Sequence, residues 1–403
     1  MLNLFRQIKD GDFDVRKLLQ SFFSRDRQSS QSSESWRRSR DLPPEIKQHA
    51  RRAIQDLSPP PPFLETVREE LDEAIQDWLD QPLEASNSLI VASNPVEAIA
   101  RILQFSVEEW QPQSQIPIRH LGWTQRPSDP ANLQAKLLAQ LGRGLPLATK
   151  QQREIVVIPN LSWCFLRCAE GLEGIEYLRK AIVAERSRFW VIGCGTLAWN
   201  YLDLVCKIAA YYPLHCSLPQ LNGEQLQAWL TPVVEEMGID FGFLQKQAEE
   251  SERESAMQEY FERLAAVSGG SSRVAVHLFM RSLVFQPSEE ETDKKDEKDK
   301  KGEKESEDGT ILAKNPRLPD LPNLSSDAHY LLYSLLLHGD MTLPHLADSL
   351  GDDEATVQHL VQNLRSTDTI EKQGEWLRVT PFHYPRLRNE LDGNNFLMAE
   401  DNN

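Results

Sequence analysis

Histidine, serine and cysteine are the residues of this sequence that could do chemistry, and their spacing does not favour catalysis. The nine histidines stand at positions 49, 120, 215, 277, 329, 338, 345, 359 and 383, without H-E-x-x-H, H-x-x-H or mixed Cys/His spacing. No serine or cysteine lies in a nucleophile elbow such as G-x-S-x-G. Because triad members need only meet in space, a hidden catalytic site stays open as an alternative.

The cysteines do not form a recognisable framework. They are Cys164, Cys168, Cys194, Cys206 and Cys216, an odd number in apolar surroundings without a C-x-x-C pair. This pattern predicts buried thiols that act as small hydrophobic side chains, rather than disulfides or structural zinc.

Phosphate binding would require a glycine-rich loop, in which successive backbone N–H groups wrap the phosphates and a lysine supplies charge. The chain has no G-x-x-x-x-G-K sequence. Its G-x-G, Gly193 to Gly195, leads into Thr196 without the third glycine of a dinucleotide loop. The sequence therefore predicts no standard phosphate cradle.

Short β-rich runs alternate with helical stretches between residues 57 and 218, which is typical of a parallel sheet covered on both faces. The predicted strands are SLIVAS (88–93), IPIRHLGW (116–123), EIVVIP (154–159), RFWVIGC (188–194) and PLHCSL (213–218), preceded by a helix after the SPPPP run at 58–62. Residues 219–286 read as wholly helical. This order predicts a three-layer α/β domain followed by an all-α segment.

Residues 323–403 read as three helices and a hairpin around Gly374, which resembles a winged-helix domain. The third helix offers Gln358, Gln362 and Arg365 as interaction candidates, but residues 324–392 hold five Lys or Arg against eleven Asp or Glu. This net charge of −6 favours contact with protein over contact with DNA. DNA contact stays open if another subunit supplies positive charge.

Two polar segments flank the predicted domains. Residues 1–56 form a basic arm, predicted to be partly disordered, with twelve Lys or Arg against seven Asp or Glu in residues 1–52. Trp36, Arg37 and Arg38 are its interaction candidates, for a protein partner, an anionic membrane surface or the acidic body of the chain itself. Residues 287–322, rich in mixed charge, are predicted to be a flexible linker, beyond which the winged helix folds by itself. The chain's net charge of −17 argues against general nucleic-acid binding.

The order of α/β domain, helical segment and winged helix resembles AAA+ NTPases, with the origin-recognition initiators and the STAND ATPases as the nearest branches. The resemblance covers roughly residues 57–390. It implies a fold class of α/β: a three-layer AAA+-like parallel sheet with an all-α lid (219–286), followed by a winged-helix domain.

The resemblance also implies where nucleotide would bind, at positions that correspond to Asn94, Asn160, Thr196 and Arg273. In LIVASNPVEAIARIL, the loop around Asn94 lacks the family's glycines and lysine, and Glu97 lies where phosphate would come. Pro159 and Asn160 replace the acidic pair that holds magnesium and activates water. Thr196 stands at the sensor-1 place, and Arg273, after Gly269 and Gly270, at the sensor-2 place.

These losses predict a degenerate AAA+-like protein with no catalytic residue, no cofactor and no metal. We expect it to regulate or scaffold through protein–protein contact, for instance with an active AAA+ homologue, and not to bind a small molecule. The alternative is an ATP- or DNA-dependent regulator that binds nucleotide weakly and contacts DNA through its winged helix. The N-terminus lacks a signal peptide and no apolar run reaches the ~20 residues of a membrane span, so we expect a cytoplasmic protein.

Overall fold

The chain divides into two compact units in a computed structural model that describes residues 42–110, 116–129, 131–146, 152–241, 250–287 and 309–398. Unit 1 is made of Met1–Leu57, Asn222–Ser268 and Ala275–Arg317. Unit 2 is made of Ser58–Leu221, Gly269–Val274 and Leu318–Asn403. The α/β domain and the winged helix therefore belong to the same unit.

Unit 2 is built on a parallel sheet of five strands in the order β2-β3-β4-β1-β5. The strands are β1 (Ser88–Ser93), β2 (Ile118–His120), β3 (Glu154–Ile158), β4 (Arg188–Gly195) and β5 (Leu214–Ser217). Each begins and ends within three residues of a predicted strand, because apolar runs bounded by turn residues are a strong signal for a buried strand. The fold class predicted from the sequence is confirmed.

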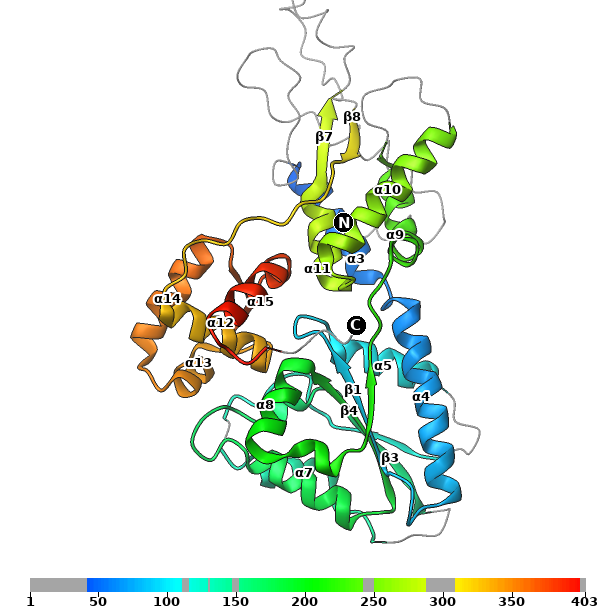
Figure 1. Ribbon diagram of the computed structural model, residues 1–403, viewed down its shortest axis with the longest axis vertical. Helices are drawn as coiled ribbons and strands as arrows, with labels where there is room; N and C mark the ends of the chain where they lie inside the picture. Colours follow the sequence, from blue (N-terminus) through cyan, green and yellow to red (C-terminus); the bar gives the residue numbers. More distant parts are fainter. Residues whose placement is uncertain are drawn as a thin grey trace, which may run out of the picture. The chain divides into compact units, whose positions relative to one another are not determined.

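Helices cover both faces of this sheet (Figure 1). They are α4 (Pro61–Asp80), α5 (Ile99–Glu109), α6 (Leu133–Leu141), α7 (Glu173–Ala184) and α8 (Thr196–Cys206). Successive strand residues point to opposite faces, so each central strand contributes to two apolar layers. This burial on both sides explains why the strands are almost continuously apolar.

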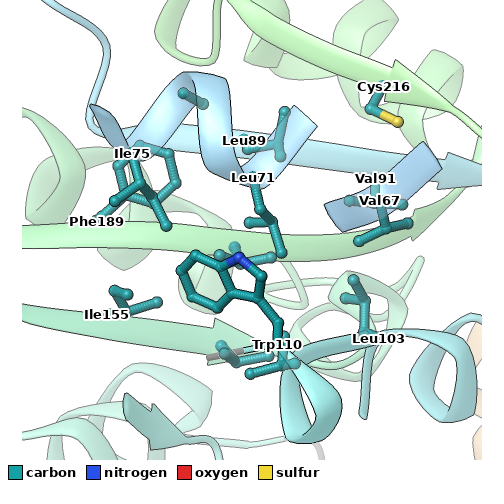
Figure 2. Close-up of a cluster of buried hydrophobic side chains, with 14 of the residues drawn as sticks. Val67, Leu71, Ile75, Leu89, Val91, Leu103, Trp110, Ile155, Phe189 and Cys216 are labelled. Carbon is teal, nitrogen blue, oxygen red and sulfur yellow. The ribbon is translucent and has the colours of Figure 1, made fainter. Parts of the chain in front are cut away.

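The layer under α4 and α5 is a packed apolar core (Figure 2). Leu71 of α4, Val91 and Ile155 of the sheet, and Trp110, which follows α5, belong to this core. The indole N–H of Trp110 donates to Asp72 Oδ1 at 2.7 Å, so its polar edge is satisfied at the rim of the core. The packing fixes the backbone from which the loops at the carboxyl edge of the sheet emerge.

The winged helix is formed by α12 (Ser326–His338), α13 (Leu343–Leu350), α14 (Glu354–Ser366), β9 (Ile370–Gln373), β10 (Trp376–Val379) and α15 (Tyr384–Gly393). An antiparallel bridge from Met341 to Leu377 adds a third short strand to the wing. Gly374 turns the hairpin with φ +62°, a conformation that costs little only for glycine. The all-polar face of α14 is exposed, as its sequence predicts.

Unit 1 contains α9 (Gly223–Met237), α10 (Glu250–Ser268) and a small sheet of β6 (Ile239–Asp240), β8 (Gly309–Ala313) and β7 (Leu283–Pro287). It differs from the sequence prediction in three places. The segment 219–286, expected to be wholly helical, also contributes β6 and most of β7, because residues 283–285 form a buried apolar run that pairs with β8. Residues 44–56 of the expected arm form helix α3 (Pro44–Asp56), whose His49 lies 3.0 Å from Glu236 of α9. Residues 309–313 of the expected linker form β8, because Ile311, Leu312 and Ala313 supply a buried apolar run.

No helix in the described part of the chain is both long enough and apolar enough to span a membrane.

The close packing of β4 predicts different effects of substitution at Gly193 and Gly195, the two glycines of its G-x-G sequence. A Cβ at Gly193 would lie 2.4 Å from the Pro159 carbonyl oxygen and 2.8 Å from the side chains of Ile99 and Leu103. At Gly195 the nearest atom is the Cα of Pro95 at 3.6 Å, an ordinary contact. We expect Gly193→Ser to lower the free energy of unfolding by about 1–3 kcal/mol through overpacking.

Gly195→Ser is the matched control, since serine at the N-cap of α8 is favourable and has room. Chemical denaturation of the two variants measures both effects. Equal stability of the two would contradict the packing shown around Gly193.

Candidate functional site

The sequence-predicted nucleotide positions meet at the carboxyl edge of the sheet. Ser93 of β1 pairs with Gly195 of β4, so Asn94 and Thr196 leave the sheet side by side. Asn160 follows β3, whose Ile158 pairs with Ile192 of β4. Parallel strands present their carboxyl ends at one edge, which is where α/β sheets bind ligands. The structure therefore places three of the four predicted positions at one edge.

The loop after β1 is a tight turn and not a phosphate cradle. The Asn94 side chain accepts the N–H of Val96 at 3.1 Å, and its carbonyl accepts the N–H of Glu97 at 2.9 Å. Asparagine followed by proline favours such a turn, because the side-chain amide caps it and Pro95 fixes φ. The N–H groups of Val96 and Glu97, which a phosphate loop would direct at its ligand, are bound within the turn.

The polar side chain that follows β3 is also hydrogen-bonded within the chain. Asn160 caps a short 3₁₀ helix (Leu161–Cys164), accepting the N–H of Ser162 on its side-chain oxygen at 2.9 Å. Pro159 before it carries no ligand atom. Across the described residues, no group of three or more His, Cys, Asp or Glu side chains is placed to hold a metal ion.

Glu97 brings the fourth predicted position into the site. Its carboxylate accepts the Ser271 hydroxyl at 2.7 Å on one oxygen and the Ser272 hydroxyl at 2.6 Å on the other. The backbone N–H of Arg273 points to the same carboxylate at 3.5 Å. These donors belong to the start of α11 (Ser272–Ser282), where unsatisfied N–H groups and the helix dipole favour a negative charge.

The Glu97 site is thus a complete anion site whose anion is supplied by the chain. Ser271 and Ser272 are buried, so their hydroxyls need an acceptor other than water. In a phosphate-binding site such donors would meet phosphate oxygens. Here two short hydrogen bonds to Glu97 take their place.

The Arg273 side chain is half-buried among charges from the wing. Burial is the main cause that lowers its pKa from the ordinary value, and the charge of Arg378 acts in the same direction. Glu97, Asp340 and Glu371 oppose this shift. Arg273 therefore faces carboxylates of its own unit.

The winged helix is joined to the α/β domain near the same edge through Arg126. This side chain is 2% exposed, and its guanidinium donates to the carbonyl oxygens of Phe165 and His338. His338 is the last residue of α12, so the cation lies at the negative end of that helix. Burial lowers the pKa of Arg126 to about 10, which leaves it charged at neutral pH.

Two buried histidines complete this junction. His338 accepts the backbone N–H of Arg167 at 3.2 Å on Nε2, so that nitrogen carries no proton. His345 places Nε2 at 3.1 and 3.0 Å from the carbonyl oxygens of Pro127 and Ser128, so it donates there. Burial lowers the pKa of both rings, and Arg126 lowers both further. Both histidines are therefore neutral in the folded protein.

The interaction candidates have no common site. Gln358, Gln362 and Arg365 are exposed along one face of α14. Trp36, Arg37 and Arg38 lie outside the described residues.

None of the five cysteines has the lowered thiol pKa that is typical of a reactive cysteine. All five are free, and burial raises the pKa of Cys164 and Cys216 to about 12.

The parallel strand order, the helical segment and the winged helix decide the fold. The core has an AAA+-like fold. No protein-family model matches the sequence, and a search of curated proteins also finds no match.

Solved structures similar to this AAA+-like chain include the Aeropyrum pernix ORC2 protein in its ADPNP–ADP complexes, at 13% identity, over 81% of this chain and 92% of that one, with a TM-score of 0.36. Pyrobaculum aerophilum Cdc6p matches at 11% identity over 83% and 94%, with a TM-score of 0.34. A mutant of Thermotoga maritima RuvB matches at 14% identity over 80% and 94%, with a TM-score of 0.31. At these TM-scores the superpositions are loose, so the sheet itself carries the assignment.

Sequence reasoning missed the internal partners of the AAA+-like site. Glu97 was expected only to repel phosphate, whereas it is bound by Ser271 and Ser272. The serine pair directly before the predicted helix was the available signal, since serine is a common N-cap. No local sequence pattern could have predicted the role of Arg126, because its hydrogen-bond acceptors lie 39 and 212 residues away in the sequence.

The Glu97 site predicts a stability effect. Glu97→Ala leaves two buried hydroxyls without an acceptor, so we expect the free energy of unfolding to fall by about 1–3 kcal/mol. Glu69→Ala, at an exposed position of α4, is the matched control and should change it by less than about 0.5 kcal/mol. Chemical denaturation of the full chain measures both, and similar values for the two would contradict the structural role of Glu97.

The buried histidines predict sensitivity to acid. Because the pKa of His338 is well below its ordinary value of 6.5 in the folded state, the unfolded chain binds the extra proton first. Stability should therefore be complete above pH 6.5 and decline as the pH falls below it. Thermal unfolding between pH 7.5 and 5.5 measures this decline.

His338→Phe should make that decline shallower, because phenylalanine keeps the ring and does not titrate. His359→Gln, at an exposed position of α14, should leave it unchanged. An unchanged slope in His338→Phe would show that other groups control the acid response.

Proposed function

We propose that this protein acts by protein–protein contact, as a regulator or scaffold whose AAA+-like core works without nucleotide. The observation that supports this most directly is the Glu97 carboxylate held by Ser271 and Ser272. A nucleotide bound in the AAA+ manner would need these donors and the N–H groups of the turn after β1. Both sets are already engaged within the chain.

The exposed face of α14 is the proposed contact surface. Gln358, Gln362 and Arg365 lie there, and all three side chains are exposed. Amide and guanidinium groups on a rigid helix can form directional hydrogen bonds with a partner. An active AAA+ homologue is the partner that the shared fold suggests.

Nucleotide independence can be tested by thermal unfolding of the full chain in millimolar ATP, with and without magnesium. A ligand at 100 times its dissociation constant would add ~2.7 kcal/mol, which is readily measured. We expect no shift, and equal recovery of partner in affinity purifications with ATP supplied or depleted. A magnesium-dependent shift, or a partner recovered only with ATP, would refute the proposal.

A further inference from the structure

Polar contacts join the winged helix to the α/β domain, and two histidines make several of them. The histidine junction, as we call this set, consists of Arg126, Arg167, His338 and His345. His338 accepts the backbone N–H of Arg167 at 3.2 Å on Nε2, and its carbonyl oxygen accepts the Arg126 guanidinium. Nε2 of His345 donates to two carbonyl oxygens of the loop after β2. The junction thus connects α12 and α13 of the winged helix to the loops after β2 and β3.

These contacts require neutral imidazole rings. His338 can accept the Arg167 N–H only while Nε2 carries no proton, and a proton there would set two donors against each other. His345 donates from Nε2 and accepts the N–H of Thr342 on Nδ1 at 3.4 Å. A second proton on that ring removes this acceptor. Protonation therefore breaks hydrogen bonds as well as adding charge.

The charges that face the two rings are mainly positive. Burial, and after it the charge of Arg126, lowers the pKa of both rings. Arg167 and His345 act on His338 in the same direction. Asp348 of α13 is the carboxylate that opposes the shift at His345. An imidazolium in the junction would therefore lie beside cations and away from water, which disfavours it.

Opening the junction would not require either domain to unfold. The winged helix has its own buried core, which includes Leu331 and Val361. The chain enters it through residues 318–325, which form neither helix nor strand. Arg386 of α15 donates to the Asp320 carboxylate in this segment at 2.6 Å, so the segment is held by the winged helix itself. The junction can therefore open as a contact between two folded parts of unit 2.

We propose that protonation of His338 and His345 releases the winged helix from the α/β domain while both stay folded. In the released state the rings meet water, where histidine has its ordinary pKa of about 6.5. The released state binds protons that the joined state excludes, so acid favours release. Between pH 7.5 and 5.5, one such histidine shifts the equilibrium about tenfold. Acid therefore acts on the junction before it unfolds either domain.

The test is hydrogen exchange of the full chain at pH 7.5, 6.5 and 5.5, with each rate divided by the intrinsic rate at that pH. The Arg167 amide reports release, because its acceptor is His338. We expect its normalised rate to rise about tenfold or more from pH 7.5 to 5.5. Amides inside α12 and β4 bond within their own domains and should change much less. An equal rise at all these places would indicate global unfolding and overturn the proposal, as would no rise at Arg167.

Glutamine variants assign the response to the two rings. His338→Gln keeps an acceptor for the Arg167 N–H but takes no charge, so the rise should shrink about tenfold. His345→Gln should also reduce the rise, although His345 bonds the loop after β2 and not Arg167, because its effect passes through docking. His359→Gln, at an exposed position of α14, is the matched control and should keep the whole rise.

Thermal midpoints at pH 7.5 verify that the variants fold. A full rise in the double variant His338→Gln with His345→Gln would overturn the proposal. Release needs no nucleotide and no partner, so the ATP measurement tests the proposed function separately.

Discussion

The buried guanidinium of Arg126 is the charge on which the arrangement of unit 2 depends. A cation removed from water costs several kcal/mol unless its donors are satisfied. Its donors meet the carbonyl oxygens of Phe165 and His338, so one side chain ties the loops after β2 and β3 to the end of α12. The same constraint requires His338 and His345 to stay neutral, because a further positive charge there would have no compensation.

With the winged helix joined in this way, the wing contributes to the surroundings of Arg273. Asp340 and Glu371 come from the wing, and Glu97 comes from the turn after β1. Arg378 lies between the wing carboxylates, with its Nε 2.5 Å from Glu371. Residues distant in sequence thus form one charge cluster around Arg273, in which Glu97, Asp340 and Glu371 are the carboxylates.

The sequence was sufficient for the layers of this fold, because buried strands such as 88–93 and 154–158 have a continuous apolar pattern that few other structures share. It was also sufficient for the winged helix, whose apolar positions repeat at helical spacing. The predicted boundaries of the N-terminal arm and of the linker were less accurate, because short apolar runs there stand beside charged residues. Residues 44–56 and 309–313 appeared to belong to polar segments, although Ile46 and Ile311 are buried. The contacts of Glu97 could not be predicted, because Ser271 and Ser272 lie 174 and 175 residues away in the sequence and local spacing carries no information on such pairs.

An acceptor that belongs to the chain behaves differently in time from a bound ligand. A bound nucleotide is consumed, exchanged and diluted, so its protein alternates between states at a rate set by chemistry and supply. Glu97 is covalently attached, and its effective concentration at Ser271 and Ser272 is fixed by the backbone. The hydrogen bonds that Glu97 makes to Ser271 and Ser272 are therefore present whenever this unit is folded, and no second molecule has to arrive for them to form.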